Sequence, residues 1–181
     1  RVIAQDELGN IWVSHPYRGV FKVKLADDYS KLEEVKLYNS QDGFPSDLLI
    51  YVFKIGDEAV FCAEKGVYSY NSEADKFEVN EKWNNIFGDD VNVRRLIEAQ
   101  NGDIWFVTDE SVGVLEVSDG GVYKKVQKKE FPKLKDKLVG GFETIYPYDN
   151  ENVFIALESG FVHFNPKNTT TDTSFQTIIR S

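Results

Sequence analysis

Titratable and nucleophilic side chains do not converge on a catalytic spacing anywhere in this sequence. The two histidines, His15 and His163, are too far apart in the chain to share the short spacing of a metal-binding motif. The single cysteine, Cys62, lies in an apolar run and is expected to be a small buried side chain and not a reactive thiol. The sequence contains no Gly-x-Ser-x-Gly elbow, no phosphate-binding loop, no Cys-x-x-Cys pair and no calcium loop. We therefore expect no catalytic residue, no metal site and no cofactor.

A second group of side chains has the chemistry to bind a ligand without transforming it. Sugar recognition uses an aromatic ring against the apolar face of the sugar and charged side chains at its hydroxyl groups. The best single cluster is His15, Tyr17 and Arg18, although the same residues also fit an ordinary solvated loop with Tyr17 packed on a neighbouring sheet. The predicted ligand-binding residues are His15, Tyr17, Arg18, Glu64, Lys65, Asp109, Glu110, Glu158, Asp42 and Phe44.

A repeat of 47 residues positions these polar segments. Gly19, Gly66, Gly113 and Gly160 follow one another in equal steps, and each is followed by an apolar residue. An apolar run precedes each glycine, and a turn cluster of Gly, Asn or Asp precedes each apolar run. Such residues adopt the positive backbone angles of tight hairpins. The apolar segments on either side of each turn are therefore expected to pair as antiparallel strands.

Each repeat has the pattern of a four-stranded meander. The first repeat has apolar segments at 2–5, 11–14, 20–25 and 34–38, and no part of the chain has the periodicity of a long amphipathic helix. Four strands in a unit of about 40–50 residues is typical of β-propeller blades. We therefore predict an all-β fold, a partial β-propeller of four four-stranded antiparallel blades over residues 1–181. The predicted blades span about residues 1–39, 48–84, 92–131 and 140–179.

The open ends of such an arc and the charge of the chain limit its partners. Four blades are usually too few to close a ring, so sheet faces or strand edges at the ends need a cover. We expect further blades of the same chain, or a second copy in a homodimer, to provide it. The net charge of −9 would repel a phosphate backbone, so nucleic acid is not an expected partner. No apolar run is long enough to span a bilayer, so no membrane contact is expected from this segment.

Two repeats carry a family motif. Segments 9–14 and 101–108, taken with Gly19 and Gly113, resemble the two-component regulator propeller repeat, and segment 42–46 is similar to that family's loop between blades. Such repeats form the periplasmic sensor of bacterial hybrid two-component systems. In that family, two seven-bladed propellers are typically followed by an immunoglobulin-like domain, a membrane segment and a histidine kinase.

The resemblance extends over all four repeats, with two departures. Phe61 and Phe154 stand where the motif prefers tryptophan. The resemblance implies a periplasmic segment of an inner-membrane protein that senses a ligand, often a carbohydrate, and whose kinase lies outside this chain. Residues 174–181 are expected to be either the fourth strand of the last blade or the first strand of a following immunoglobulin-like domain.

Three classes of function fit such a segment. The resemblance implies a small-molecule or oligosaccharide sensor, with no catalysis in this chain. A protein interaction scaffold is the alternative, because propeller faces and open sheet edges are natural docking surfaces. A propeller lyase or glycosidase is the third class, although adjacent carboxylates such as Asp89 and Asp90 are more simply explained as solvated turn residues.

Overall fold

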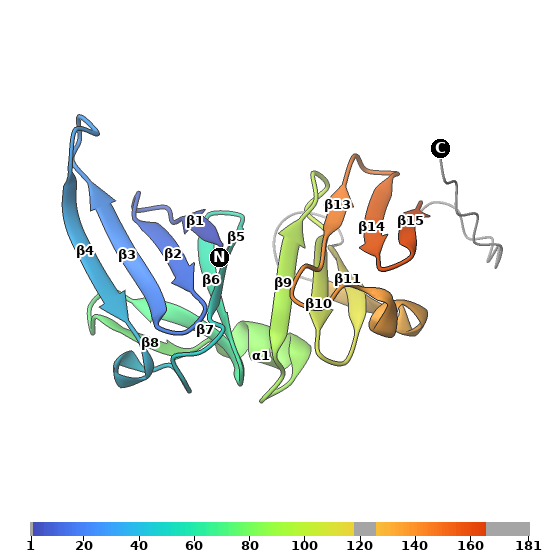
Figure 1. Cartoon of the computed structure of the whole chain (residues 1–181), viewed down its shortest axis with the longest axis horizontal. Coiled ribbons are helices and arrows are strands. Elements are labelled where there is room, and N and C mark those ends of the chain that lie inside the picture. The colour runs from blue at the N-terminus through green and yellow to red at the C-terminus, as the bar shows by residue number, and fades with distance from the viewer. Residues whose placement is uncertain (1, 118–125, 166–181) are drawn as a thin grey trace. The chain divides into compact units, whose positions relative to one another are not determined.

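The computed structural model describes residues 2–117 and 126–165, which form four antiparallel sheets in succession along the chain (Figure 1). Within each sheet, strands that are neighbours in the sequence are also neighbours in the hydrogen-bonded order. Three sheets have four strands, and the last has three described strands. The prediction of an all-β chain built from four antiparallel meanders is therefore confirmed.

The strands follow the predicted repeat closely. The first two sheets contain β1 (Ile3–Gln5), β2 (Ile11–His15), β3 (Gly19–Leu25), β4 (Leu32–Tyr38), β5 (Tyr51–Ile55), β6 (Glu58–Ala63), β7 (Gly66–Asn71) and β8 (Lys76–Val79). The third and fourth sheets contain β9 (Val93–Glu98), β10 (Ile104–Thr108), β11 (Val112–Val117), β12 (Val126–Glu130), β13 (Ile145–Pro147), β14 (Val153–Leu157) and β15 (Gly160–Phe164).

Three short helices lie in the segments that join successive sheets, where the sequence predicts loops. They are η1 (Ser40–Asp42), α1 (Glu81–Phe87) and η2 (Pro132–Lys137). Each is too short to produce a detectable helical period in the sequence. The last strand of the third repeat is predicted at 122–126, whereas β12 begins at residue 126, and 122–125 lie outside the described residues. The strand predicted over 174–181 also lies outside them.

The chain divides into two compact units, residues 1–96 and residues 97–181. The first unit contains the sheets β1–β4 and β5–β8, and the division falls within β9. Each unit has a core of its own, formed between side chains of successive sheets. The grouping of all 181 residues into one domain stays a prediction.

Aromatic rings from two sheets form the core of the first unit. Trp12 on β2 is fully buried, and its ring meets that of Phe61 on β6 edge-to-face with centroids 4.9 Å apart. Phe77 on β8 approaches Phe61 in the same geometry at 4.7 Å. Tyr38 on β4 completes the cluster, 5.8 Å from Trp12. Such pairs contribute about 0.5–1.5 kcal/mol each beyond the area that they bury, so these rings join the two sheets firmly.

The second unit uses a tryptophan in the same way. Trp105 on β10 stacks on Phe131 with centroids 5.8 Å apart, and it meets Phe164 on β15 edge-to-face at 5.4 Å. Val153 and Ile155 on β14 are buried in the same cluster. In both units, a tryptophan on the second strand of one sheet therefore packs against the following sheet.

Three of the four repeated glycines occupy the same structural position. Gly19, Gly66 and Gly160 each begin the third strand of a sheet, with φ of 97°, 100° and 142°. A Cβ at Gly19 would lie 2.0 Å from a backbone oxygen of β4, so a larger residue does not fit. Gly113 is instead the second residue of β11, without positive φ, and a Cβ there would lie 2.3 Å from the backbone oxygen of Lys129 and 2.5 Å from the ring of Phe106. In the third repeat, glycine therefore makes room for the neighbouring strand and for a ring, and it does not begin the strand.

Cys62 has the environment that the sequence predicts. Its side chain is fully buried on β6. Burial raises the pKa of the Cys62 thiol, because the thiolate would lose its hydration. The residue is therefore an inert part of the core.

A polar cluster ties β4 to the turn between β7 and β8. Asp75 in that turn pairs with the ammonium group of Lys36 and accepts hydrogen bonds from the hydroxyls of Tyr38 at 2.6 Å and Tyr70 at 2.5 Å. These contacts, the one to Lys36 foremost, hold the pKa of the Asp75 carboxyl well below its usual range. The folded state therefore favours the ionised carboxylate at this position.

We predict that Asp75→Asn weakens the acid sensitivity of the fold. A carboxyl whose pKa is lower in the folded state stabilises that state above the unfolded pKa of about 3.9, and this stabilisation is lost as the pH falls below that value. Urea unfolding at a series of pH values from neutral to acidic should give a shallower decline in unfolding free energy for the variant. Glu73→Gln changes an exposed carboxylate in the same turn and should leave the slope unchanged. Equal slopes for wild type and Asp75→Asn would contradict the assignment.

Candidate functional site

Most of the predicted ligand-binding residues lie in exposed turns between the second and third strands of their sheets. The exposed side chains are those of Tyr17, Arg18, Glu64, Lys65, Asp109, Glu110 and Glu158. His15 and Asp42 are half-buried, and Phe44 is buried. The turns therefore present a charged surface with one aromatic ring, that of Tyr17.

The turn between β2 and β3 orders its own polar residues. The backbone N–H of Tyr17 donates a hydrogen bond to Nδ1 of His15 at 3.2 Å, and the two rings are 6.4 Å apart at an angle of 71°. The Tyr17 side chain is 67% exposed, so it does not pack on a neighbouring sheet as the alternative interpretation supposes. Its ring is open to a ligand, with Arg18 beside it in the sequence.

Backbone hydrogen bonds fasten the joining segments to these turns. Leu49 N donates to Pro16 O at 3.0 Å, and Gly66 N donates to Val91 O at 3.1 Å. In the second unit, Glu158 N donates to Lys137 O at 2.9 Å. In each case the turn after the second strand lies beside a segment that joins two sheets. Within a unit, the turns and the joining segments that they contact therefore lie at the same end of the strands.

Asp42 and Phe44, predicted to face a ligand from a joining segment, have structural partners instead. The Asp42 carboxylate accepts a hydrogen bond from Asn39 N at 2.9 Å and completes the capping box of η1. The Phe44 ring stacks on Phe77 with centroids 4.0 Å apart and is only 4% exposed. Because the core covers the Phe44 ring, a ligand could reach it only by displacing that packing.

The remaining predicted residues are divided between the two units. Asp109, Glu110 and Glu158 belong to the second unit, so the structure does not place them relative to Tyr17. Within its turn, Glu110 N donates to Oγ1 of Thr108 at 3.2 Å. Arg18, Glu64 and Lys65 form no ion pair with any described residue. Their charges face solvent and are available to a ligand.

One buried amide holds α1 against β7. Asn84 is 6% exposed, its Oδ1 accepts a hydrogen bond from Val67 N at 2.9 Å, and its Nδ2 donates to Val67 O at 3.0 Å. The side chain thus pairs with the strand in the way that a neighbouring backbone would. Asn84 fixes where the joining segment leaves the second sheet and approaches the turn at 64–65.

We predict that Asn84→Ala destabilises the fold by about 1–3 kcal/mol, because it leaves the buried N–H of Val67 without its acceptor. The measurement is the free energy of unfolding in urea, followed by tryptophan fluorescence. Asn85→Ala removes the same chemical group from the adjacent exposed position, and it should change stability by less than about 0.5 kcal/mol. If the two variants were equally stable, the amide would not have this role.

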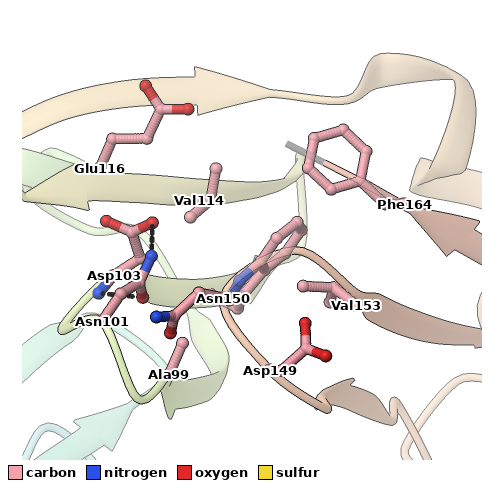
Figure 2. A pocket seen from close by; sticks show the side chains of 10 residues that line it. Ala99, Asn101, Asp103, Val114, Glu116, Asp149, Asn150, Val153 and Phe164 are labelled. Carbon is pink, nitrogen blue, oxygen red and sulfur yellow. Dashed lines mark hydrogen bonds between the residues drawn. The ribbon is translucent and has the colours of Figure 1, made fainter. Parts of the chain in front are cut away.

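The sequence does not reveal a small cleft in the second unit. It lies between the turn that joins β9 to β10 and the turn that joins β13 to β14, and its volume is about 10 Å³. Figure 2 shows Asn150 from the second turn extending toward Asn101 and Asp103 from the first, with the carboxylate of Asp149 on the other side of its loop. One sequence feature points to this cleft: Ala99 stands at the turn position where the first repeat has Asp6.

The described residues contain neither a candidate metal site nor a candidate membrane span. Across 2–117 and 126–165, no three or more His, Cys, Asp or Glu side chains are grouped so that they could hold a metal ion. In the same two segments, no helix has the length and apolar character needed to cross a membrane.

Solved structures share the fold of this chain, whereas neither a protein-family model nor a curated protein matches it. The extracellular domain of BT4673 from B. thetaiotaomicron matches in two structures, assigned to a one-component system in one and to a hybrid two-component system in the other. The TM-scores are 0.60 and 0.58 at 15% identity, covering 93% of this chain and 22% of that chain. The extracellular domain of BT3049, assigned to a hybrid two-component system of the same organism, matches with a TM-score of 0.55 at 17% identity, covering 91% and 20%.

These matches establish the fold and show how much of each matched chain it covers. At such low identity, the likeness shows that the four antiparallel sheets belong to a propeller-like architecture, as the sequence predicts. The chain spans about a fifth of the length of the solved chains that it matches. It is structurally similar to a part of the extracellular domains of bacterial signalling proteins.

Proposed function

We propose that this chain is a ligand-sensing segment of a periplasmic propeller in a two-component signalling protein, and that it recognises oligosaccharide without catalysing a reaction. The observation that carries the proposal is the match of nine-tenths of the chain to extracellular domains assigned to such systems. The exposed polar turns support it, because most of their charged side chains face solvent and do not pack in a core.

The turn at 15–18 would provide the first contacts. The exposed ring of Tyr17 offers a flat apolar surface of the kind on which the carbon-bound face of a sugar stacks. Arg18 is exposed and forms no ion pair with any residue in 2–117 or 126–165, so within these segments its guanidinium can donate to sugar hydroxyls without first breaking an ion pair. Glu64 and Lys65 in the next turn add an acceptor and a donor.

We predict that a sugar ligand raises the melting temperature of the chain, because a ligand that binds only the folded state stabilises it. The measurement is a thermal-shift screen against di- and oligosaccharides, followed by calorimetric titration of each positive compound. Tyr17→Ala and Arg18→Ala should each weaken binding about tenfold or more, which corresponds to about 1.4 kcal/mol. Tyr29→Ala removes a ring that is 80% exposed in a different turn and serves as the matched control.

Two results would contradict this proposal. One is the absence of a shift with every saccharide, and the other is equal binding by Tyr17→Ala and Tyr29→Ala. Turnover of a polysaccharide that disappears in Asp109→Asn would instead indicate the lyase or glycosidase class.

An apolar sheet face favours a scaffold as the second candidate function. The register of the first sheet places seven apolar side chains on the face away from Trp12, and none of them is buried. They are Ile3, Ile11, Val13, Phe21, Val23, Val35 and Leu37. A face of this kind is typical of an interaction surface. When the chain is studied in isolation, a second copy of it can supply the sheet that covers this face.

We predict that the isolated chain self-associates through this face and that Val35→Lys weakens the association. Burying a lysine ammonium without a partner opposes assembly, so the dissociation constant should rise about tenfold or more. Sedimentation velocity over a range of protein concentrations measures it. Val79→Lys is the control, because Val79 is 58% exposed on another sheet against 55% for Val35. A monomer at every concentration would exclude this surface as a contact between copies.

A further inference from the structure

In the first unit, an aspartate in the turn between β1 and β2 accepts the indole hydrogen bond of a buried tryptophan. The Asp6 carboxylate accepts hydrogen bonds from the backbone of Leu8 at 3.0 Å and from the backbone and side chain of Asn10, both at 2.9 Å. It also accepts a hydrogen bond of 2.8 Å from Nε1 of Trp12. The indole N–H that sheet packing buries therefore has an acceptor within its own sheet.

The third sheet repeats this turn without the carboxylate. Asp6 N donates to Asn10 O and Gly9 N to Asp6 O, each at 3.1 Å. Correspondingly, Ala99 N donates to Asp103 O at 2.8 Å and Gly102 N to Ala99 O at 2.9 Å. The turn glycines have matching φ values, 81° for Gly9 and 84° for Gly102. Ala99 thus occupies the position of Asp6, and Asp103 that of Asn10.

Trp105 is consequently left with an unused donor. It corresponds to Trp12, its side chain is 2% exposed, and no described residue accepts a hydrogen bond from its Nε1. The small cleft lies at this place, because Ala99 and Trp105 both line it. A carboxylate at residue 99 would occupy this space, and its absence leaves the cleft next to an unpaired indole N–H.

The other polar groups of the cleft come from both turns and from β11. Asp103 accepts hydrogen bonds from Val117 N at 2.9 Å and from Nδ2 of Asn101 at 2.7 Å. Asp149 accepts from the backbone of Glu151 at 2.7 Å, which foremost lowers the pKa of its carboxyl. Figure 2 shows Asp103 and the amide of Asn150 near one another, whereas the carboxylates of Asp149 and Glu116, which also line the cleft, lie apart from this pair. The cleft therefore combines a donor, an amide and carboxylate acceptors.

These groups select one class of ligand by charge. An anion would accept from the indole N–H but would be repelled by Asp103 and Asp149, whereas Glu116 is paired with Lys129 at 3.7 Å. A cation would be attracted by the carboxylates but cannot accept a hydrogen bond from Trp105. A hydroxyl group is neutral, accepts one hydrogen bond and donates another, so it satisfies both requirements.

We propose that this cleft is a binding site for a polyhydroxylated compound, in which one hydroxyl oxygen accepts from Nε1 of Trp105 and donates to the carboxylate of Asp103. The volume of about 10 Å³ admits about one oxygen atom with its hydrogen, so the rest of the ligand lies over the opening, against Asn150 and Glu116. The site uses none of the residues of the turn at 15–18 and does not depend on the function proposed for that turn.

The indole N–H resonances of the ¹⁵N-labelled chain test the proposal directly. Titration with glucose and with maltotriose should displace the Trp105 signal saturably and leave the Trp12 signal in place, because Trp12 is already bonded to Asp6. Trp105→Phe assigns the signal by removing it. Acetate and methylammonium, as an anion and a cation, should produce no saturable change. Displacement of neither signal by the sugars, or of both equally, would overturn the proposal, and so would an equal response to acetate.

A designed acceptor provides the matched variant. Ala99→Asn places a neutral carbonyl oxygen where Asp6 has its carboxylate, and its amide can donate to Asp103, whereas an aspartate there would face the charge of Asp103. We expect this variant to melt at a higher temperature and to lose the sugar response of Trp105. Persistence of that response in a folded Ala99→Asn chain would overturn the proposal. Tyr17→Ala should leave the Trp105 response unchanged, so the proposal for this cleft and the proposal for the turn at 15–18 can be refuted independently.

Discussion

Packing between successive sheets is the constraint on which the rest of this structure depends. A single four-stranded sheet with apolar side chains on both faces cannot bury them by itself. Trp12 in the first unit and Trp105 in the second solve the problem by extending from the second strand into the core shared with the following sheet. The positive φ of Gly19 and Gly66 supports this arrangement, because it lets the third strand begin close to a neighbouring segment.

Burying a tryptophan also creates a polar requirement, since its indole N–H loses contact with bulk water. The first unit meets this requirement inside the turn, where Asp6 accepts the hydrogen bond. The second unit has Ala99 at that place and a cleft beside Trp105. One residue in a turn therefore decides whether the same element is purely structural or can recognise an external oxygen. The indole N–H can either stabilise the fold through a bond within its own turn or bind a ligand oxygen.

The surface differs from the cores in its side chains. Side chains committed to the cores are aromatic or aliphatic, whereas the turns after the second strands carry charges that face solvent. Some carboxylates have structural roles: Asp75 joins two sheets through Lys36 and two tyrosines, and Asp42, predicted to bind a ligand, caps a helix. The exposed turns therefore carry the side chains on which the proposed recognition depends.

The sequence by itself determined the repeat, the antiparallel meanders and the exposure of most turn residues. These features are local: a turn glycine such as Gly66 and the apolar runs beside it specify a hairpin through residues that are close in the chain. Only the tertiary structure decided the burial of Phe44, the packing role of Gly113, the helix around Asn84 and the unpaired donor of Trp105. Each depends on which sheet face meets which, and side chains distant in the sequence settle that by packing and by hydrogen bonding.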